Sequence, residues 1–224
     1  APDDTDGGDT GSSGEMQGGE ADTAAEAGTH TAHCVCGGNG DVNGHIHSTN
    51  TAWNAADSLP TSAGSYYLTQ SVSGDWAVPT DGEVNLCLNG QTISGKITIG
   101  SGATLTLTDC IGNGKVQGEV TVNGGKFELY GGTIIGGVEV GRHSNPATGS
   151  AFTMYGGKIS GNTDTDGVFL VGTTNDNDPP RFTMHGGTIS GNTAAASDGG
   201  GGGVYVGEKC SFTMDGGTIT GNTA

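Results

Sequence analysis

Three copies of one twelve-residue stretch decide the fold: FTMYGGKISGNT at 152–163, FTMHGGTISGNT at 182–193 and FTMDGGTITGNT at 212–223. A degenerate copy, FELYGGTIIGG, begins at Phe127. The phenylalanines that open the four copies lie 25, 30 and 30 residues apart. A period of this length is typical of a solenoid, in which each unit buries its apolar face only against its neighbours.

Within one copy the side chains alternate with a period of two. Phe152 and Met154 face one side of a strand and Thr153 the other, and Ile159 faces inward after the Gly-Gly turn. A third short apolar strand follows in most units: Val120/Val122, Val138/Val140, Val168/Leu170 and Val204/Val206. Three short strands per unit, joined by corners of Gly and Asn that tolerate left-handed backbone, favour a parallel β-helix over a leucine-rich or helical repeat.

The expected fold is therefore all-β, a right-handed parallel β-helix solenoid of about six coils over residues 59–224, forming a rod roughly 30 Å long. The asparagines of the GNT motifs, Asn162, Asn192 and Asn222, should stack in a ladder and satisfy backbone groups at one corner. Trp53 and Trp76, the two tryptophans, are expected to cap the N-terminal end of the core. The earlier coils have these inward positions: Leu68, Val72, Trp76, Val78, Val84, Leu86, Leu88, Ile97, Ile99, Leu105 and Leu107.

Residues 1–28 form an acidic, low-complexity tail. They contain eight of the 24 acidic residues and no Lys or Arg, and the formal net charge of the whole chain is −17. This charge argues against nucleic acid or anionic lipid as a partner. The run Asp4-Thr-Asp6-Gly-Gly-Asp9 resembles part of a calcium loop but lacks the Glu of an EF-hand, so a solvated linker is the favoured interpretation and calcium the weaker one.

Residues 29–58 are rich in Cys and His and are expected to form a metal-binding hairpin. Cys34-x-Cys36 and His45-x-His47 each place two ligands on one face of a strand, and the intervening GGNGDVNG can fold one pair onto the other. Two thiolates and two imidazoles suit a tetrahedral, structural zinc ion. A disulfide from Cys34 or Cys36, or exposed histidines in a linker, are the alternatives.

Three further cysteines follow, Cys87, Cys110 and Cys210. Cys87 and Cys110 are 23 residues apart, near the local coil length, so they can meet on adjacent turns and form a disulfide. Cys210 is then either a small buried hydrophobe, the favoured interpretation, or a site for crosslinking.

The sequence favours an extracellular location. No apolar stretch is long enough to cross a bilayer, so membrane insertion is not expected. The start, Ala-Pro-Asp-Asp, suits a chain left after signal-peptide cleavage. The end, Gly-Asn-Thr-Ala, falls one strand set into a repeat, which predicts that the chain continues or that another molecule covers this end.

Several segments together resemble a known family: HTAHCVCGGNGDVNGHIH, SLPTSAGSYYLTQSVSGDWAVP, VNLCLNGQTISG, and FTMxGGTISGNTA with GGGVYV. The chain is similar over residues 29–224 to the large, secreted, repeat-rich β-helix surface proteins of gut anaerobic Gram-positive bacteria, which have a right-handed pectin-lyase-like fold. The resemblance implies cell-surface display, adhesion and extracellular assembly. The wall-anchoring segments of such proteins are not found in this sequence.

Pectin-lyase-like folds also host polysaccharide lyases and hydrolases, which need carboxylate clusters and a basic residue on one face. Here the position after FTM varies as Tyr155, His185 and Asp215, and Arg142, Arg181 and Lys209 are expected to lie isolated in loops. We therefore expect no enzyme, because a fold alone does not confer activity.

The expected function is that of a non-enzymatic extracellular or cell-surface structural and adhesive protein that assembles end to end into filaments. Its partners would be other copies of itself, or glycans or proteins of a host or cell surface. The alternative is a carbohydrate-active enzyme or glycan-binding module. An ice-binding function is less favoured, because the array Thr104-Leu-Thr106-Leu-Thr108 is not repeated in later coils.

Overall fold

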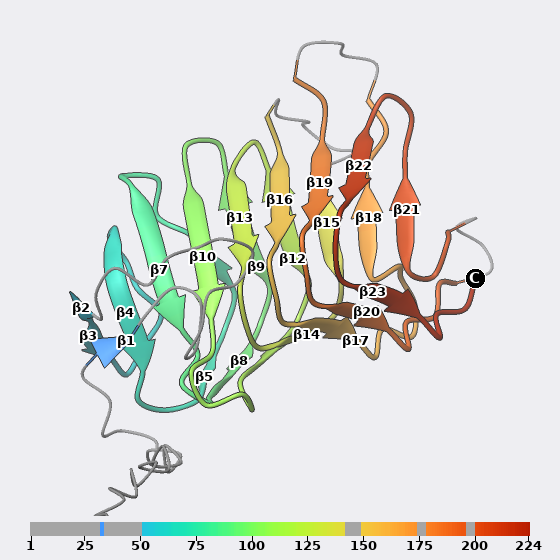
Figure 1. Ribbon diagram of the computed structural model, residues 1–224. Coiled ribbons are helices and arrows are strands. Elements are labelled where there is room, and N and C mark those ends of the chain that lie inside the picture. Colours follow the sequence, from blue (N-terminus) through green and yellow to red (C-terminus); the bar gives the residue numbers. More distant parts are fainter. Residues whose placement is uncertain (1–31, 34–50, 142–148, 174–177, 196–199) are drawn as a thin grey trace, which may run out of the picture.

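The computed structural model describes residues 32–33, 51–141, 149–173, 178–195 and 200–224. Within these ranges the chain contains strands and no helix, and hence no helix long and apolar enough to cross a membrane. β1 (Ala32–His33) and β2 (Thr51–Ala52) form a separate antiparallel pair. All other strands belong to three parallel sheets that enclose one core (Figure 1).

The eight-stranded sheet contains, in spatial order, β22 (Ser211–Met214), β19 (Arg181–Met184), β16 (Ala151–Met154), β13 (Lys126–Leu129), β10 (Thr104–Thr108), β7 (Glu83–Cys87), β4 (Gly64–Leu68) and β3 (Asn54–Ala56). The seven-stranded sheet contains β23 (Thr218–Thr220), β20 (Thr188–Ser190), β17 (Lys158–Ser160), β14 (Thr133–Ile135), β11 (Lys115–Gln117), β8 (Thr92–Ser94) and β5 (Val72–Ser73). The six-stranded sheet contains β21 (Val204–Val206), β18 (Val168–Leu170), β15 (Val138–Val140), β12 (Val120–Asn123), β9 (Ile97–Gly100) and β6 (Trp76–Ala77).

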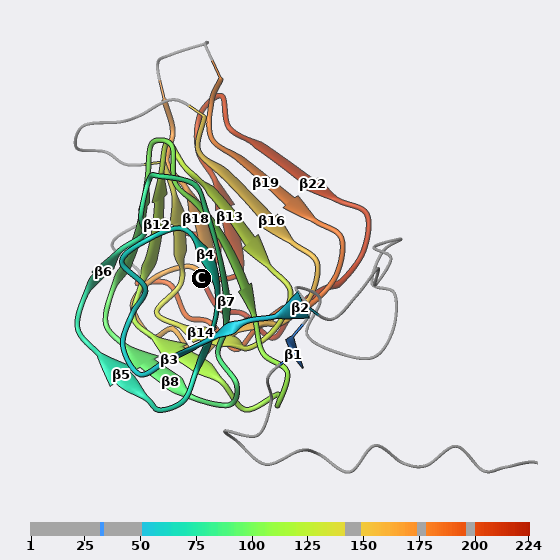
Figure 2. The ribbon, with the colours of Figure 1, turned by 90° about the vertical axis from the view of Figure 1, so that its left-hand side faces the viewer.

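Each coil takes one strand from each sheet in turn. Six coils run from β4–β5–β6 to β19–β20–β21, and β22 with β23 begins another. Figure 2 looks toward one end of the rod, with the coils one behind another around a common interior. The all-β parallel β-helix of about six coils that the repeats predict is thereby confirmed.

The core is built from columns of identical residues in register. Phe127, Phe152, Phe182 and Phe212 pair from strand to strand, and their rings stack with centroids 5.0, 4.7 and 4.9 Å apart. The first three of these side chains are fully buried. The earlier inward positions behave as expected, apart from the half-buried Val72: Leu68, Trp76, Val78, Val84, Leu86, Leu88, Ile97, Ile99, Leu105 and Leu107 are buried.

The asparagine ladder is also confirmed. Asn162 Nδ2 donates to Asn192 Oδ1 at 2.9 Å, and Asn192 Nδ2 donates to Asn222 Oδ1 at 2.9 Å. The amides of Asn192 and Asn222 also donate to backbone carbonyls of the preceding coil, to Ile159 at 3.2 Å and to Ile189 at 3.0 Å. One side-chain column therefore satisfies the polar backbone at a buried corner.

The Gly-Gly of the repeat serves two different needs. A Cβ on Gly156 would lie 2.4 Å from the carbonyl oxygen of Tyr130 in the preceding coil, so only glycine fits there. Gly157 has φ +75°, in the left-handed region that favours glycine.

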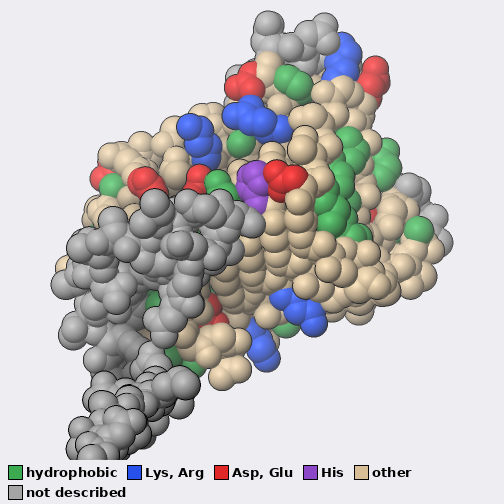
Figure 3. Space-filling model, in the orientation of Figure 1, with side chains coloured by type: hydrophobic (Ala, Val, Ile, Leu, Met, Phe, Trp, Pro, Cys, Tyr) green, Lys and Arg blue, Asp and Glu red, His purple; other side chains and the backbone are tan. Residues whose placement is uncertain are grey.

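Figure 3 shows one broad face of the rod, on which charged side chains gather mainly toward the edges.

The N-terminal end differs in part from expectation. Trp76 is buried in the main core, and its Nε1 donates to the carbonyl oxygen of Pro60 at 2.9 Å, which fits a capping role. Trp53, in contrast, packs with Tyr67 and Cys87 in a small cluster separate from the main core. The prediction that Trp53 caps the core is thus wrong, because β3, next to Trp53 in the chain, has joined the eight-stranded sheet.

Candidate functional site

The outward side chains of the six-stranded sheet form one column along the rod. Strand register aligns, coil by coil, Ala77, Thr98, Thr121, Glu139, Phe169 and Tyr205. The rings of Phe169 and Tyr205 stack with centroids 4.8 Å apart and planes 7° from parallel. The column is therefore polar from Thr98 to Glu139 and aromatic at Phe169 and Tyr205, and the two parts meet between Glu139 and Phe169.

A pocket opens where these two halves meet, with a volume of about 430 Å³. Three acidic residues line it, Glu119, Glu139 and Asp166, together with Thr165 and Phe169. The rest of the wall is formed by residues 136–138 and Ala194. We call this the acidic pocket; it combines one apolar ring with a few polar groups, as ligand sites commonly do.

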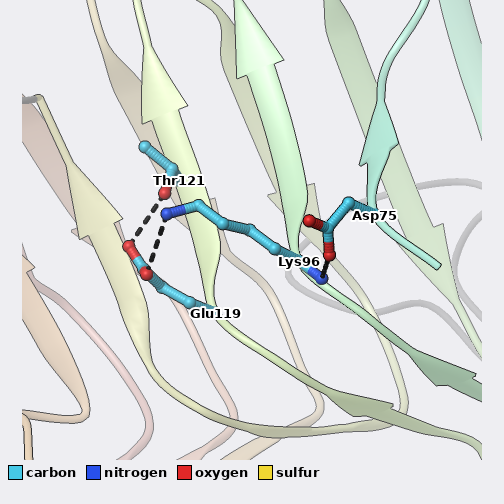
Figure 4. Close-up of polar contacts among 4 residues, drawn as sticks. All are labelled: Asp75, Lys96, Glu119 and Thr121. Carbon is cyan, nitrogen blue, oxygen red and sulfur yellow. Dashed lines mark hydrogen bonds and ion pairs between the residues drawn. The ribbon is translucent and has the colours of Figure 1, made fainter.

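Two side chains hold Glu119 in place, one from the preceding coil and one from β12, the strand that begins at the next residue. Its carboxylate accepts hydrogen bonds from Lys96 Nζ at 2.9 Å and from the Thr121 hydroxyl at 2.8 Å (Figure 4). The backbone N–H of Lys96 donates to the carboxylate of Asp75 at 2.9 Å, which fixes the start of the lysine side chain. The lysine is therefore paired rather than available as a free base.

The ionisation of Glu119 reflects two opposing causes. Burial raises the pKa of its carboxyl group most strongly, but hydrogen bonds with Lys96, Thr121 and Glu139 together outweigh burial, so that the pKa lies below its ordinary value. The acidic pocket therefore presents an ionised Glu119 carboxylate as a hydrogen-bond acceptor.

Replacing Glu119 with Gln should weaken the fold slightly and only above acidic pH. Because the folded-state pKa is below the ordinary Glu value of about 4.3, the carboxylate stabilises the fold above that value, and this contribution is lost as the pH falls through the folded-state pKa. Side-chain exposures of 37% for Lys96 and 36% for Glu119 limit the effect to about 0.5–1 kcal/mol. Urea unfolding of both proteins, from neutral pH to about 2, checks this; a difference independent of pH would contradict it.

A second column, missed from the sequence, lies on the outer side of the eight-stranded sheet. The residues that follow FTM or FEL stack in order: the rings of Tyr130 and Tyr155 are 4.5 Å apart and those of Tyr155 and His185 are 5.0 Å apart. His185 Nδ1 then lies 2.8 and 2.9 Å from the carboxylate oxygens of Asp215. Burial is the main cause that raises the pKa of both tyrosines. His185 and Asp215 are 30 residues apart, so the 30-residue period of the repeats predicts that they lie next to each other.

Arg181 corrects another expectation. It opens β19 rather than lying isolated in a loop, and its guanidinium pairs with Asp178 at 2.6 Å. Lys209 has a left-handed backbone with φ +64°, and Arg142 lies outside the described residues. Thr106 and Thr108, part of the proposed ice-binding array, are buried and thus cannot present a flat surface to ice.

The predicted metal ligands Cys34, Cys36, His45 and His47 all lie outside the described residues. Structural zinc there stays a prediction, as does the weaker one of calcium on the acidic tail. The described residues on either side of this segment, His33 and Thr51, pair with each other in β1 and β2. Within the part of the chain that the structure describes, no three His, Cys, Asp or Glu side chains are arranged to hold a metal ion.

The cysteine predictions have mixed outcomes. Cys87 and Cys110 do meet on adjacent coils, as thiols with Sγ atoms 3.2 Å apart. Cys210 is half-buried against the core, and its thiol donates to the carbonyl oxygen of Val171 at 3.1 Å.

No family model, curated protein or solved structure matches the chain.

Proposed function

We propose that this protein is a non-enzymatic, extracellular adhesive β-helix that displays a glycan-binding site, the acidic pocket. The observation that carries the proposal is the junction of Phe169 with the carboxyl groups of Glu119 and Glu139 in a cavity of about 430 Å³. A sugar ring has C–H groups on its faces, which pack on an aromatic ring, and hydroxyl groups at its edge, which donate to carboxylates. The resemblance to secreted surface proteins supports the same location and role.

The chemistry of the pocket favours neutral sugars or amino sugars. Three acidic residues line it, and the chain has a net charge of −17, so uronic acids and sulfated sugars would be repelled. A protonated amino group on the sugar would instead donate a charge-assisted hydrogen bond to a carboxylate.

The arrangement supports binding rather than hydrolysis. A glycosidase needs one carboxylic acid that protonates the leaving group and a second carboxylate that acts as nucleophile or base. The Glu119 carboxylate instead accepts hydrogen bonds from Lys96 Nζ and the Thr121 hydroxyl, so it is held as an ionised acceptor. Lys96 forms an ion pair with Glu119 at 2.9 Å and is therefore not a free amine that could accept a proton.

The test is a binding screen of the whole chain against neutral, amino and acidic oligosaccharides, followed by titration calorimetry on the best ligand. Phe169→Ala should weaken binding by tenfold or more, since it removes the packing surface. Tyr155→Ala, which removes an aromatic ring from the other column, is the matched control and should bind normally. Absence of any glycan binding, or equal binding by both variants, would refute the proposal.

Assembly end to end remains part of the proposal. The end strands of the three sheets, β21, β22 and β23, expose apolar side chains, with Val206 42% and Met214 44% exposed, and Phe212 and Ile219 border a hollow of about 400 Å³. Met184 and Ile189, the residues that pair with Met214 and Ile219 one coil earlier, are fully buried. A second copy that continued these columns would bury them and pair the free strand edges. Negative-stain images should then show filaments, and a strictly monomeric protein would contradict this part of the proposal.

A further inference from the structure

Two cysteines from neighbouring coils lie side by side on the outer face of the eight-stranded sheet. Cys87 ends β7 and pairs in register with Thr108 of β10, and Cys110 follows two residues later. The Sγ atoms are 3.2 Å apart, and the backbone N–H of Cys110 donates to the Cys87 sulfur at 3.3 Å. A disulfide needs about 2.05 Å between the sulfurs, so a movement of roughly 1 Å would allow the bond to form.

The two thiols differ in their access to solvent. Cys87 is fully buried beneath Trp53 and Tyr67, whereas Cys110 is only partly buried. The hydrogen bond with Cys110, followed by burial, raises the pKa of the Cys87 thiol well above its ordinary value. An oxidant from solvent therefore meets Cys110 first, and Cys87 is positioned to react second.

We propose that Cys87 and Cys110 form a redox-controlled disulfide that links the coil of β7–β9 to the coil of β10–β12. The link joins the second and third coils of the rod beside the cluster that contains Trp53. It does not depend on the acidic pocket or on glycan binding, because these thiols lie on a different sheet.

The reaction is a thiol–disulfide exchange with a small disulfide such as oxidised glutathione. The Cys110 thiolate attacks one glutathione sulfur, which forms a mixed disulfide and releases one glutathione thiolate. The Cys87 sulfur then attacks the Cys110 sulfur while its proton passes to the departing glutathione sulfur, and the second glutathione leaves as a thiol. Two protein thiols are oxidised, and one glutathione disulfide is reduced to two thiols.

Such a bond closes a loop between residues 23 apart in sequence and should stabilise the folded protein. For a domain of this size, the melting temperature should rise on the order of 5 °C. A reductant should reverse the change. Disulfides persist outside the cell, which is the location proposed above.

The full chain would be reduced, incubated with oxidised glutathione, quenched with acid, and alkylated under denaturing conditions. Peptide mapping without reduction should show a peptide that joins Cys87 to Cys110. The variant Cys110→Ser should lack this link, whereas Cys210→Ser should retain it. Recovery of both cysteines as alkylated thiols, or links from Cys110 to Cys34 or Cys36 instead, would overturn the proposal.

The melting temperature of the wild-type chain, oxidised and reduced, gives an independent readout that needs no variant. An oxidised protein that melts several degrees higher, with the link mapped, supports the proposal. A mapped link with no rise in melting temperature would overturn its stabilising role. Either result is independent of whether a glycan binds to the acidic pocket.

Discussion

Phe182→Ala should lower the free energy of unfolding by about 3–5 kcal/mol. Phe182 is fully buried, and its ring stacks between those of Phe152 and Phe212 at 4.7 and 4.9 Å. Truncation removes the transfer free energy of the ring and leaves a cavity between two coils that the fixed strand spacing prevents from collapsing. Urea unfolding followed by far-ultraviolet circular dichroism measures the loss.

Phe212→Ala is the matched control for this experiment. It removes the same ring from the same column, but in the last coil, where Phe212 is only half-buried. Its cost should be clearly smaller. Equal losses in both variants would mean that the column does not stabilise the fold through burial.

Asn192→Ala should cost about 2–4 kcal/mol. Asn192 is fully buried, accepts a hydrogen bond from Asn162 Nδ2, and donates to Asn222 Oδ1 and to the carbonyl oxygen of Ile159. Truncation leaves the Asn162 amide and the Ile159 carbonyl without these partners in a site that water reaches poorly. Thermal and urea unfolding should show the loss together.

Asn222→Ala gives the comparison for the ladder. Asn222 lies at its last step and is partly exposed, so water can replace the lost hydrogen bonds. We expect less than half the loss seen for Asn192→Ala. A loss for Asn192→Ala below that for Asn222→Ala would contradict the proposed role of the buried ladder.

The repeated part of the fold could be predicted because identical residues recur at a constant period. Phe152, Phe182 and Phe212 must align once each coil has 30 residues, and Asn162, Asn192 and Asn222 then align as well. The same logic would have predicted the pair of His185 and Asp215, which occupy one position of successive repeats. The repeat period therefore predicts which residues are neighbours on the outer face of the sheet as well as in the core.

The acidic pocket could not be predicted in this way. Along its column, Thr121, Glu139, Phe169 and Tyr205 follow one another at spacings of 18, 30 and 36 residues, because the corners of these coils differ in length. The apolar pairs Val138/Val140 and Val168/Leu170 predict that Glu139 and Phe169 are neighbours. Nothing in the sequence, however, places Glu119 and Asp166, which lie at corners outside the strands, around them. Trp53 was misplaced for a similar reason, since the pairing of β3 with β4 depends on contacts that lie outside the repeats.

The central claim, that the acidic pocket binds a glycan without cleaving it, is tested most directly by one experiment. The wild-type chain and Phe169→Ala would be titrated with the best oligosaccharide from the screen, and the recovered sugar would be analysed by mass spectrometry. We expect saturable binding by the wild-type chain, at least tenfold weaker binding by Phe169→Ala, and an intact sugar. Equal affinity in the two proteins, or shortened or unsaturated sugar products, would contradict it.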